Sequence, residues 1–92
     1  MNNKNILKRN VVALLKAVEL EARRDGHIDA PDGHVHLYNG YLAQAKALSP
    51  GDPRLESLYQ VEQGITNSEL YALAGGLDAA LDLELPYPVT GR

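Results

Sequence analysis

Residues 4–24 read KNILKRNVVALLKAVELEARR, and this stretch decides the fold class. It contains neither glycine nor proline, the two residues that most strongly disfavour a helix interior. Its apolar residues recur at intervals of three or four, as one face of an α-helix requires. These residues are Leu7, Val11, Leu14, Val18 and Ala22. The stretch therefore predicts a long amphipathic helix.

A second apolar stripe runs along another side of the same expected helix. Successive residues of an α-helix are rotated by about 100°. This rotation groups four more residues on that side: Ile6, Ala13, Ala17 and Leu20. A helix that covers a core on one side needs only one such stripe. We therefore expect this helix to have neighbours on two sides, either within the chain or in a dimer.

Proline and glycine residues divide the rest of the chain. Gly26 can end the first helix, and Pro31 suits the opening of a second. Asp52 can cap a third helix that has Pro53 at its first position. We therefore expect two helices in this region, the second of them short.

A capping box opens a fourth helix, because Thr66 can bond forward and Glu69 can bond back. Pro86 cannot continue a helix, so residues 86–92 are expected to form an extended tail. The chain is predicted to be one all-α domain, residues 1–92, forming a compact bundle of about four helices without a sheet. Three helices are long and one is short, and they cover about residues 4–24, 34–48, 53–62 and 67–84.

Length and composition limit the class of protein. The 92 residues leave room for one core and carry a net charge of −3. We expect the first and fourth helices to supply most of this core, with Tyr38, Tyr41 and Tyr59 around its margin. Cysteine is absent, which excludes disulfides and thiolate metal ligands. No segment reads as a signal peptide or approaches the roughly 18 apolar residues of a membrane span. These features favour a cytoplasmic protein.

Charge is distributed unevenly along the chain. Residues 1–46 carry seven Lys and Arg against five Asp and Glu, whereas residues 47–92 carry two against seven. The acidic half disfavours nucleic acid as a ligand. Basic residues of the first helix alternate with Glu19 and Glu21, as on an ordinary solvated helix face. We therefore do not expect nucleic-acid binding.

All three histidines and three carboxylates fall within residues 25–36. Imidazole and carboxylate are good ligands for zinc and similar ions. An EF-hand loop is excluded, because Ala30 stands where its turn needs glycine. On a helix, His34 and His36 would project about 200° apart and could not share one ion. The remaining candidate ligands are His27, Asp29, Asp32 and His34.

No other segment indicates chemistry. The chain lacks a cysteine nucleophile, a serine in a nucleophile elbow and a glycine-rich loop after a strand. We therefore predict no catalytic residue and no cofactor. The alternative function is metal binding by residues 25–36, and if the protein is an enzyme, this metal would serve a hydrolytic reaction.

Gly75 and Gly76 interrupt the fourth helical pattern, at a cost of about 1 kcal/mol each relative to alanine. Ala72, Gly76 and Ala79 share one side of this helix, where another helix backbone could approach closely. Alternatively, the helix kinks, or stops at Gly75 and restarts at Leu77. The leading hypothesis is therefore a protein-interaction module that self-associates, most simply as a homodimer. Its interface candidates are Ile6, Ala13, Ala17, Leu20, Ala72, Gly76 and Ala79.

Overall fold

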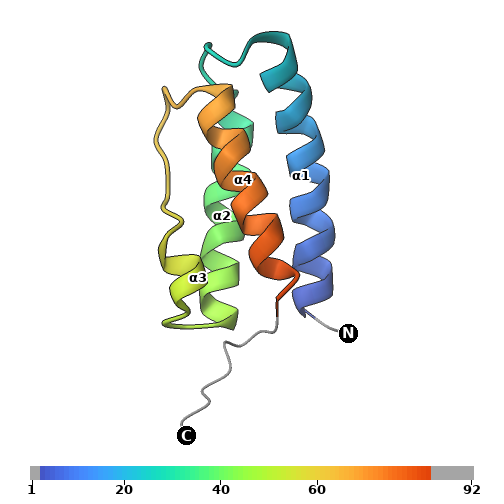
Figure 1. Cartoon of the computed structure of the whole chain (residues 1–92), viewed down its shortest axis with the longest axis vertical. Coiled ribbons are helices and arrows are strands. Elements are labelled where there is room, and N and C mark those ends of the chain that lie inside the picture. The colour runs from blue at the N-terminus through green and yellow to red at the C-terminus, as the bar shows by residue number, and fades with distance from the viewer. Residues whose placement is uncertain (1–2, 84–92) are drawn as a thin grey trace, which may run out of the picture.

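The computed structural model describes residues 3–83 and confirms an all-α bundle of three long helices and one short one. Helices α1 and α2 run antiparallel, and α4 packs against both of them (Figure 1). Within the described residues, the only β-type pairing is an isolated bridge between Asp29 and Thr66. The helices are α1 (Asn3–Asp25), α2 (Asp32–Leu48), α3 (Pro53–Glu56) and α4 (Asn67–Leu81).

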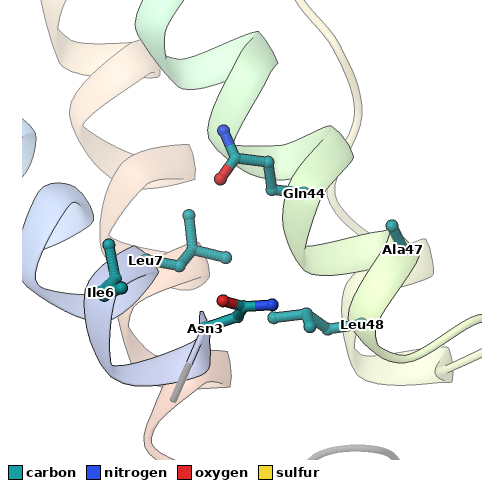
Figure 2. Close-up of a pocket in the computed structure, with 6 residues that line it drawn as sticks. All are labelled: Asn3, Ile6, Leu7, Gln44, Ala47 and Leu48. Atoms are coloured by element: carbon teal, nitrogen blue, oxygen red, sulfur yellow. The ribbon is translucent and has the colours of Figure 1, made fainter. Parts of the chain in front are cut away.

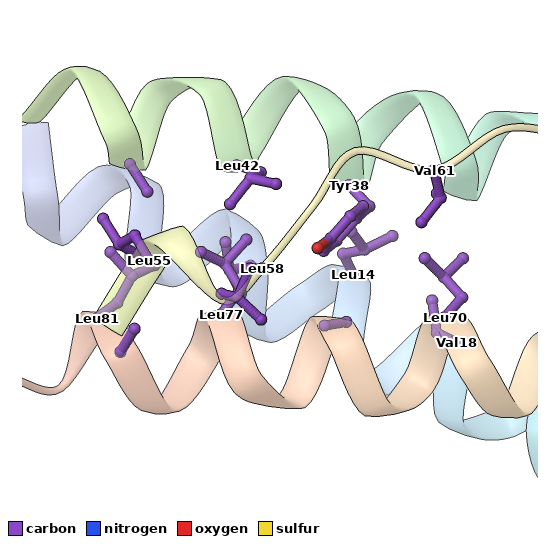
Figure 3. Close-up of a cluster of buried hydrophobic side chains, with 14 of the residues drawn as sticks. Leu14, Val18, Tyr38, Leu42, Leu55, Leu58, Val61, Leu70, Leu77 and Leu81 are labelled. Carbon is purple, nitrogen blue, oxygen red and sulfur yellow. The ribbon is translucent and has the colours of Figure 1, made fainter. Parts of the chain in front are cut away.

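The core forms where the three long helices meet (Figure 3). The first apolar stripe of α1 is buried as predicted, except that Ala22 is only partly covered. Residues from α2 and α4 complete this core in comparable numbers, so α2 contributes more than the sequence indicated. The buried apolar residues of the three helices are Leu7, Val11, Leu14 and Val18; Val35, Tyr38, Leu42 and Ala45; and Leu70, Ala74, Leu77, Ala80 and Leu81.

Helix α3 is shorter than predicted, because the chain leaves the helix after Glu56 and continues without helical structure along α2. Side chains of α2 hold this segment by its backbone. Tyr38 Oη donates to the Tyr59 carbonyl at 3.0 Å. Asn39 Nδ2 donates to the Val61 carbonyl at 2.8 Å, and Val61 N donates to Asn39 Oδ1 at 2.9 Å. These bonds replace the helical bonds that residues 57–62 would otherwise make.

Tyr38 lies inside the core and not at its margin, which corrects the sequence-based expectation. Its side chain is fully buried, whereas Tyr59 is 57% exposed and Tyr41 is partly covered. Burial, with a smaller contribution from Tyr59, raises the pKa of the Tyr38 hydroxyl to about 12. The hydroxyl can be buried because it has a carbonyl partner.

Asp52 organises the turn between α2 and α3. As predicted, it caps α3, accepting from Arg54 N at 2.9 Å. The Arg54 guanidinium donates to both carboxylate oxygens, and Ser49 Oγ donates to one of them at 3.0 Å. The hydrogen bond from the Arg54 side chain is the main reason why the pKa of Asp52 falls to about 2.

Helix α4 begins at the predicted cap, where Glu69 N donates to Thr66 Oγ1 at 3.2 Å. The return bond differs from the expected capping box, because Glu69 Oε1 accepts from the Thr66 hydroxyl, at 3.2 Å, and not from its backbone N–H. The helix runs unbroken through both central glycines, so it neither stops nor restarts there, and it ends at Leu81. The expected tail, residues 86–92, lies outside the described residues. None of the helices within residues 3–83 combines the length and apolar character needed to cross a membrane.

The start of α4 is tied to the connection between α1 and α2. Asn67 Nδ2 donates to the Asp25 carbonyl at 3.0 Å, and Asn67 N donates to the Ile28 carbonyl at 2.9 Å. Ala30 N donates to the Ile65 carbonyl at 2.8 Å. These bonds hold α4 on one side of the α1–α2 pair (Figure 1), and no helix within residues 3–83 covers the opposite side.

Candidate protein-interaction face

A hollow lies between the first turns of α1 and the last turns of α2 (Figure 2). Its volume is about 280 Å³. Ile6 and Leu7 line it from α1, and Leu48 lines it from α2, where Gln44 adds an amide. The complete lining is Asn3, Ile6, Leu7, Gln44, Ala47 and Leu48.

A second hollow, of about 200 Å³, lies further along the same two helices. It is lined by Asn10, Ala13, Leu14, Ala17, His34, Leu37 and Tyr41. Neither lining includes a residue of α3 or α4. The two hollows therefore lie one after the other along the seam between α1 and α2. We call this line of hollows the groove, and the surface that contains it the α1–α2 face.

Both helices present regular stripes along this face. The stripe of α1 has the spacing 3-4-3-4-3, and that of α2 has the spacing 3-4-3-4. This is the spacing with which helices interlock side chains in coiled coils and bundles. The α1 stripe is Asn3, Ile6, Asn10, Ala13, Ala17 and Leu20, and the α2 stripe is His34, Leu37, Tyr41, Gln44 and Leu48.

Large apolar side chains are exposed on these stripes. Ile6 is 37% exposed, Leu37 is 41% exposed and Leu20 is 64% exposed. Scattered apolar residues are normal on a protein surface, but a periodic apolar stripe beside a groove is typical of an interaction site. The face also has polar members, among them Asn10 and His34, and the buried Nδ1 of His34 has no hydrogen-bond partner within the described residues.

The seven interface candidates do not form one surface. Ile6, Ala13 and Ala17 line the groove, and Leu20 continues their stripe. The α4 candidates lie elsewhere: Ala72 and Ala79 are exposed on α4, which lines neither hollow. Gly76 faces the same chain, because a Cβ atom built there would lie 3.0 Å from Cδ2 of Leu58.

The α2 half of the face is absent from the sequence-based candidates. In the sequence, Leu37, Tyr41 and Leu48 cannot be told apart from Tyr38 and Leu42, because all five belong to one broad apolar stripe of the second expected helix. The structure separates them: Tyr38 and Leu42 are fully buried, Leu37 is exposed, and Tyr41 and Leu48 are partly buried against the edge of the core. The available signal was the spacing, because a stripe with members at both 37 and 38 and at both 41 and 42 is wider than one helix contact needs.

The outer edges of the face differ in charge and size. On α1, Arg9, Lys16 and Arg23 are exposed at seven-residue spacing, which places them along one edge. Arg23 pairs with Glu19, whereas Arg9 and Lys16 make no ion pair among the described residues. On α2, the residues at seven-residue spacing are small and exposed: Gly33, Gly40 and Ala47. A Cβ atom added at either glycine would meet nothing within 4 Å.

The histidine and aspartate residues of the α1–α2 connection do not assemble around a common point. Asp25 Oδ1 accepts from His27 N at 2.9 Å, and Asp29 takes part in the bridge to Thr66. His34 is turned towards the groove. Across residues 3–83, no three histidine, aspartate or glutamate residues are grouped closely enough to hold a metal ion. The candidates His27, Asp29, Asp32 and His34 therefore lack a shared geometry.

Comparison with known proteins adds no further constraint: no protein-family model matches the chain, and no curated protein or solved structure is significantly similar to it.

Proposed function

We propose that this protein is an interaction module that binds another helical surface through its α1–α2 face, most simply as a homodimer. The observation that supports the proposal is the pair of stripes beside the groove, which are exposed or partly exposed and both have coiled-coil spacing. A bundle that needed only to bury its own core would require one stripe on each helix.

The composition of the chain is compatible with work in the cytoplasm. A chain without cysteine gains nothing from an oxidising compartment, where disulfides usually stabilise small domains. We therefore propose the cytoplasm as its location. Association would also add buried surface to a domain of a size that is often only marginally stable by itself.

Self-association is tested by light scattering coupled to size-exclusion chromatography over a wide range of protein concentrations. We expect the mass to rise from that of the 10.0 kDa monomer towards twice that value. Ala13→Glu introduces a charge into the groove and should keep the protein monomeric. Ala72→Glu makes the same chemical change at an exposed position of α4 and should leave association unchanged.

Two results would contradict the proposal. One is a wild-type protein that remains monomeric at every concentration. The other is equal weakening of association by Ala13→Glu and Ala72→Glu, since this would show that charge in general, and not the α1–α2 face, controls assembly. Circular dichroism should show unchanged helix content in both variants, because both alanines are exposed.

A further inference from the structure

We infer that the α1–α2 face pairs with the same face of a second copy about a two-fold axis parallel to the helices, so that α1 of each copy lies on α2 of the other. This inference rests on the proposed function and specifies its geometry. Homodimers with two-fold symmetry use the same patch on both subunits. Two such arrangements bring the faces together: the axis runs along the helices, or it runs across them. In the second case, α1 lies on α1 and α2 on α2.

The basic residues along the edge of α1 favour one of the two arrangements over the other. An axis across the helices would bring the Arg9–Lys16–Arg23 edge of one copy beside the identical edge of the other. Like charges placed together across an interface are unfavourable. An axis along the helices instead places this edge beside the uncharged edge of α2, which consists of Gly33, Gly40 and Ala47.

The sizes of the side chains along the two edges favour the same arrangement, in which the axis is parallel to the helices. The stems of arginine and lysine can lie along an apolar surface while their charged groups stay in water. The glycine edge of α2 offers open space for these stems, and both edges repeat every seven residues. Gly40 lies in the interior of α2, where glycine costs about 1 kcal/mol relative to alanine. A close approach by a second chain would explain why a glycine is present there.

The register follows from the position of the axis. Rotation about an axis parallel to the helices leaves the height of every residue unchanged. Residues that line one hollow together within a chain therefore also meet between chains. This places Ala13 of one copy near Leu37 of the other, and Ala17 near His34. Small residues of α1 would then face larger residues of α2, which is how helices interlock.

The size of the face is sufficient for a weak dimer. Helix α2 has 17 residues, or a length of about 25 Å. Two adjacent helices are about 20 Å wide, so each copy contributes about 500 Å² of flat area. The two copies together would bury about 1,000 Å², the lower limit for a specific interface. We therefore expect a dimer that dissociates on dilution.

Cysteine pairs test the arrangement directly, because the chain has no cysteine of its own. Ala13→Cys and Leu37→Cys are prepared as separate proteins, mixed in equal amounts and oxidised mildly. Intact mass spectrometry distinguishes the three possible disulfide-linked dimers. We expect the mixed 13–37 product to exceed the share that random pairing would produce. Equal or greater yields of the 13–13 and 37–37 products would overturn this arrangement.

A second pair of variants tests the glycine edge. Gly40→Gln fills the space assigned to the arginine and lysine stems, and we expect it to raise the dimer dissociation constant about tenfold, or 1.4 kcal/mol. Gly75→Gln adds the same side chain to a position of α4 where a Cβ atom likewise meets nothing within 4 Å, and it should leave the dissociation constant unchanged. Equal effects would overturn the arrangement. Wild-type protein that forms dimers but gives no excess of the 13–37 product refutes only this geometry, whereas wild-type protein that never dimerises refutes the proposed function as well.

Discussion

Replacing the two central glycines of α4 by alanine, one at a time, should change stability by different amounts. Alanine is favoured over glycine in a helix interior by about 1 kcal/mol. At Gly75, the new methyl group would meet nothing within 4 Å, so the full gain is expected. For a domain of this size, 1 kcal/mol corresponds to a rise in melting temperature of about 4–8 °C.

At Gly76, the same substitution meets an obstacle. The new Cβ atom would lie 3.0 Å from Cδ2 of Leu58, closer than ordinary van der Waals contact. Leu58 is 8% exposed and packed in the core, so it must shift within a filled space. We therefore expect Gly76→Ala to gain clearly less than Gly75→Ala, although helix propensity alone predicts equal gains.

The free energy of unfolding is measured by urea denaturation, followed by far-ultraviolet circular dichroism at a concentration where the protein is monomeric. The comparison within the pair cancels errors that the two extrapolations share. A loss of stability in Gly75→Ala would refute the assignment of open space beside Gly75. An equal gain in both variants would refute the close contact between α4 and Leu58.

Three further measurements test the fold. The folded state lowers the pKa of Asp52 to about 2 from 3.8, so Asp52 contributes stability that is lost as the pH falls from about 4 to about 2. Asp52→Asn should remove this contribution to the pH dependence, as measured by acid denaturation. Because the folded state raises the pKa of Tyr38 to about 12 from 10.0, stability should fall as the pH rises through this window. Tyr38→Phe should reduce this fall without removing it, because the pKa of Lys8 is also raised in the folded state, where its partial burial is outweighed by its pairing with Asp78 and Asp82. The substitution should also cost about 1 kcal/mol at neutral pH through the lost bond to the Tyr59 carbonyl, and thermal melts from neutral to alkaline pH would show both effects. Leu77→Ala should lower the free energy of unfolding in urea by about 2–5 kcal/mol, because Leu77 is fully buried. Leu83→Ala, at an exposed position, should lower it much less, and similar losses in the two variants would contradict the packing of α4.

Half of the candidate face was predictable from sequence. The second stripe of α1 is visible because its members are apolar on a side that a simple amphipathic helix would leave polar. The groove residues Ile6, Ala13 and Ala17 were identified in this way. Charges along the neighbouring edge, including Arg9 and Lys16, make the boundary of this stripe sharp, so its extent could be read without knowing the fold.

The α2 half was not predictable in the same way. Apolar residues occupy both 37 and 38 and both 41 and 42, so the two stripes of α2 overlap in sequence. Which stripe faces the core depends on where α4 and the segment after α3 lie. The structure buries Tyr38 and Leu42 beneath these elements and leaves Leu37 partly exposed.

The sequence by itself determined the three long helices and the start of α3, because apolar spacing and caps, such as those at Asp52 and Thr66, act over a few neighbouring residues. The end of α3 depended instead on tertiary bonds from Tyr38 and Asn39. Only the tertiary structure decided how many neighbours each helix has. Hydrogen bonds between distant segments, such as Asn39 with Val61 and Asn67 with Asp25, place α4 and the segment after α3 against one side of the α1–α2 pair. The second stripe of α1, which contains Ile6, Ala13 and Ala17, therefore lies beside a stripe of α2 on the side of the pair that α4 does not cover.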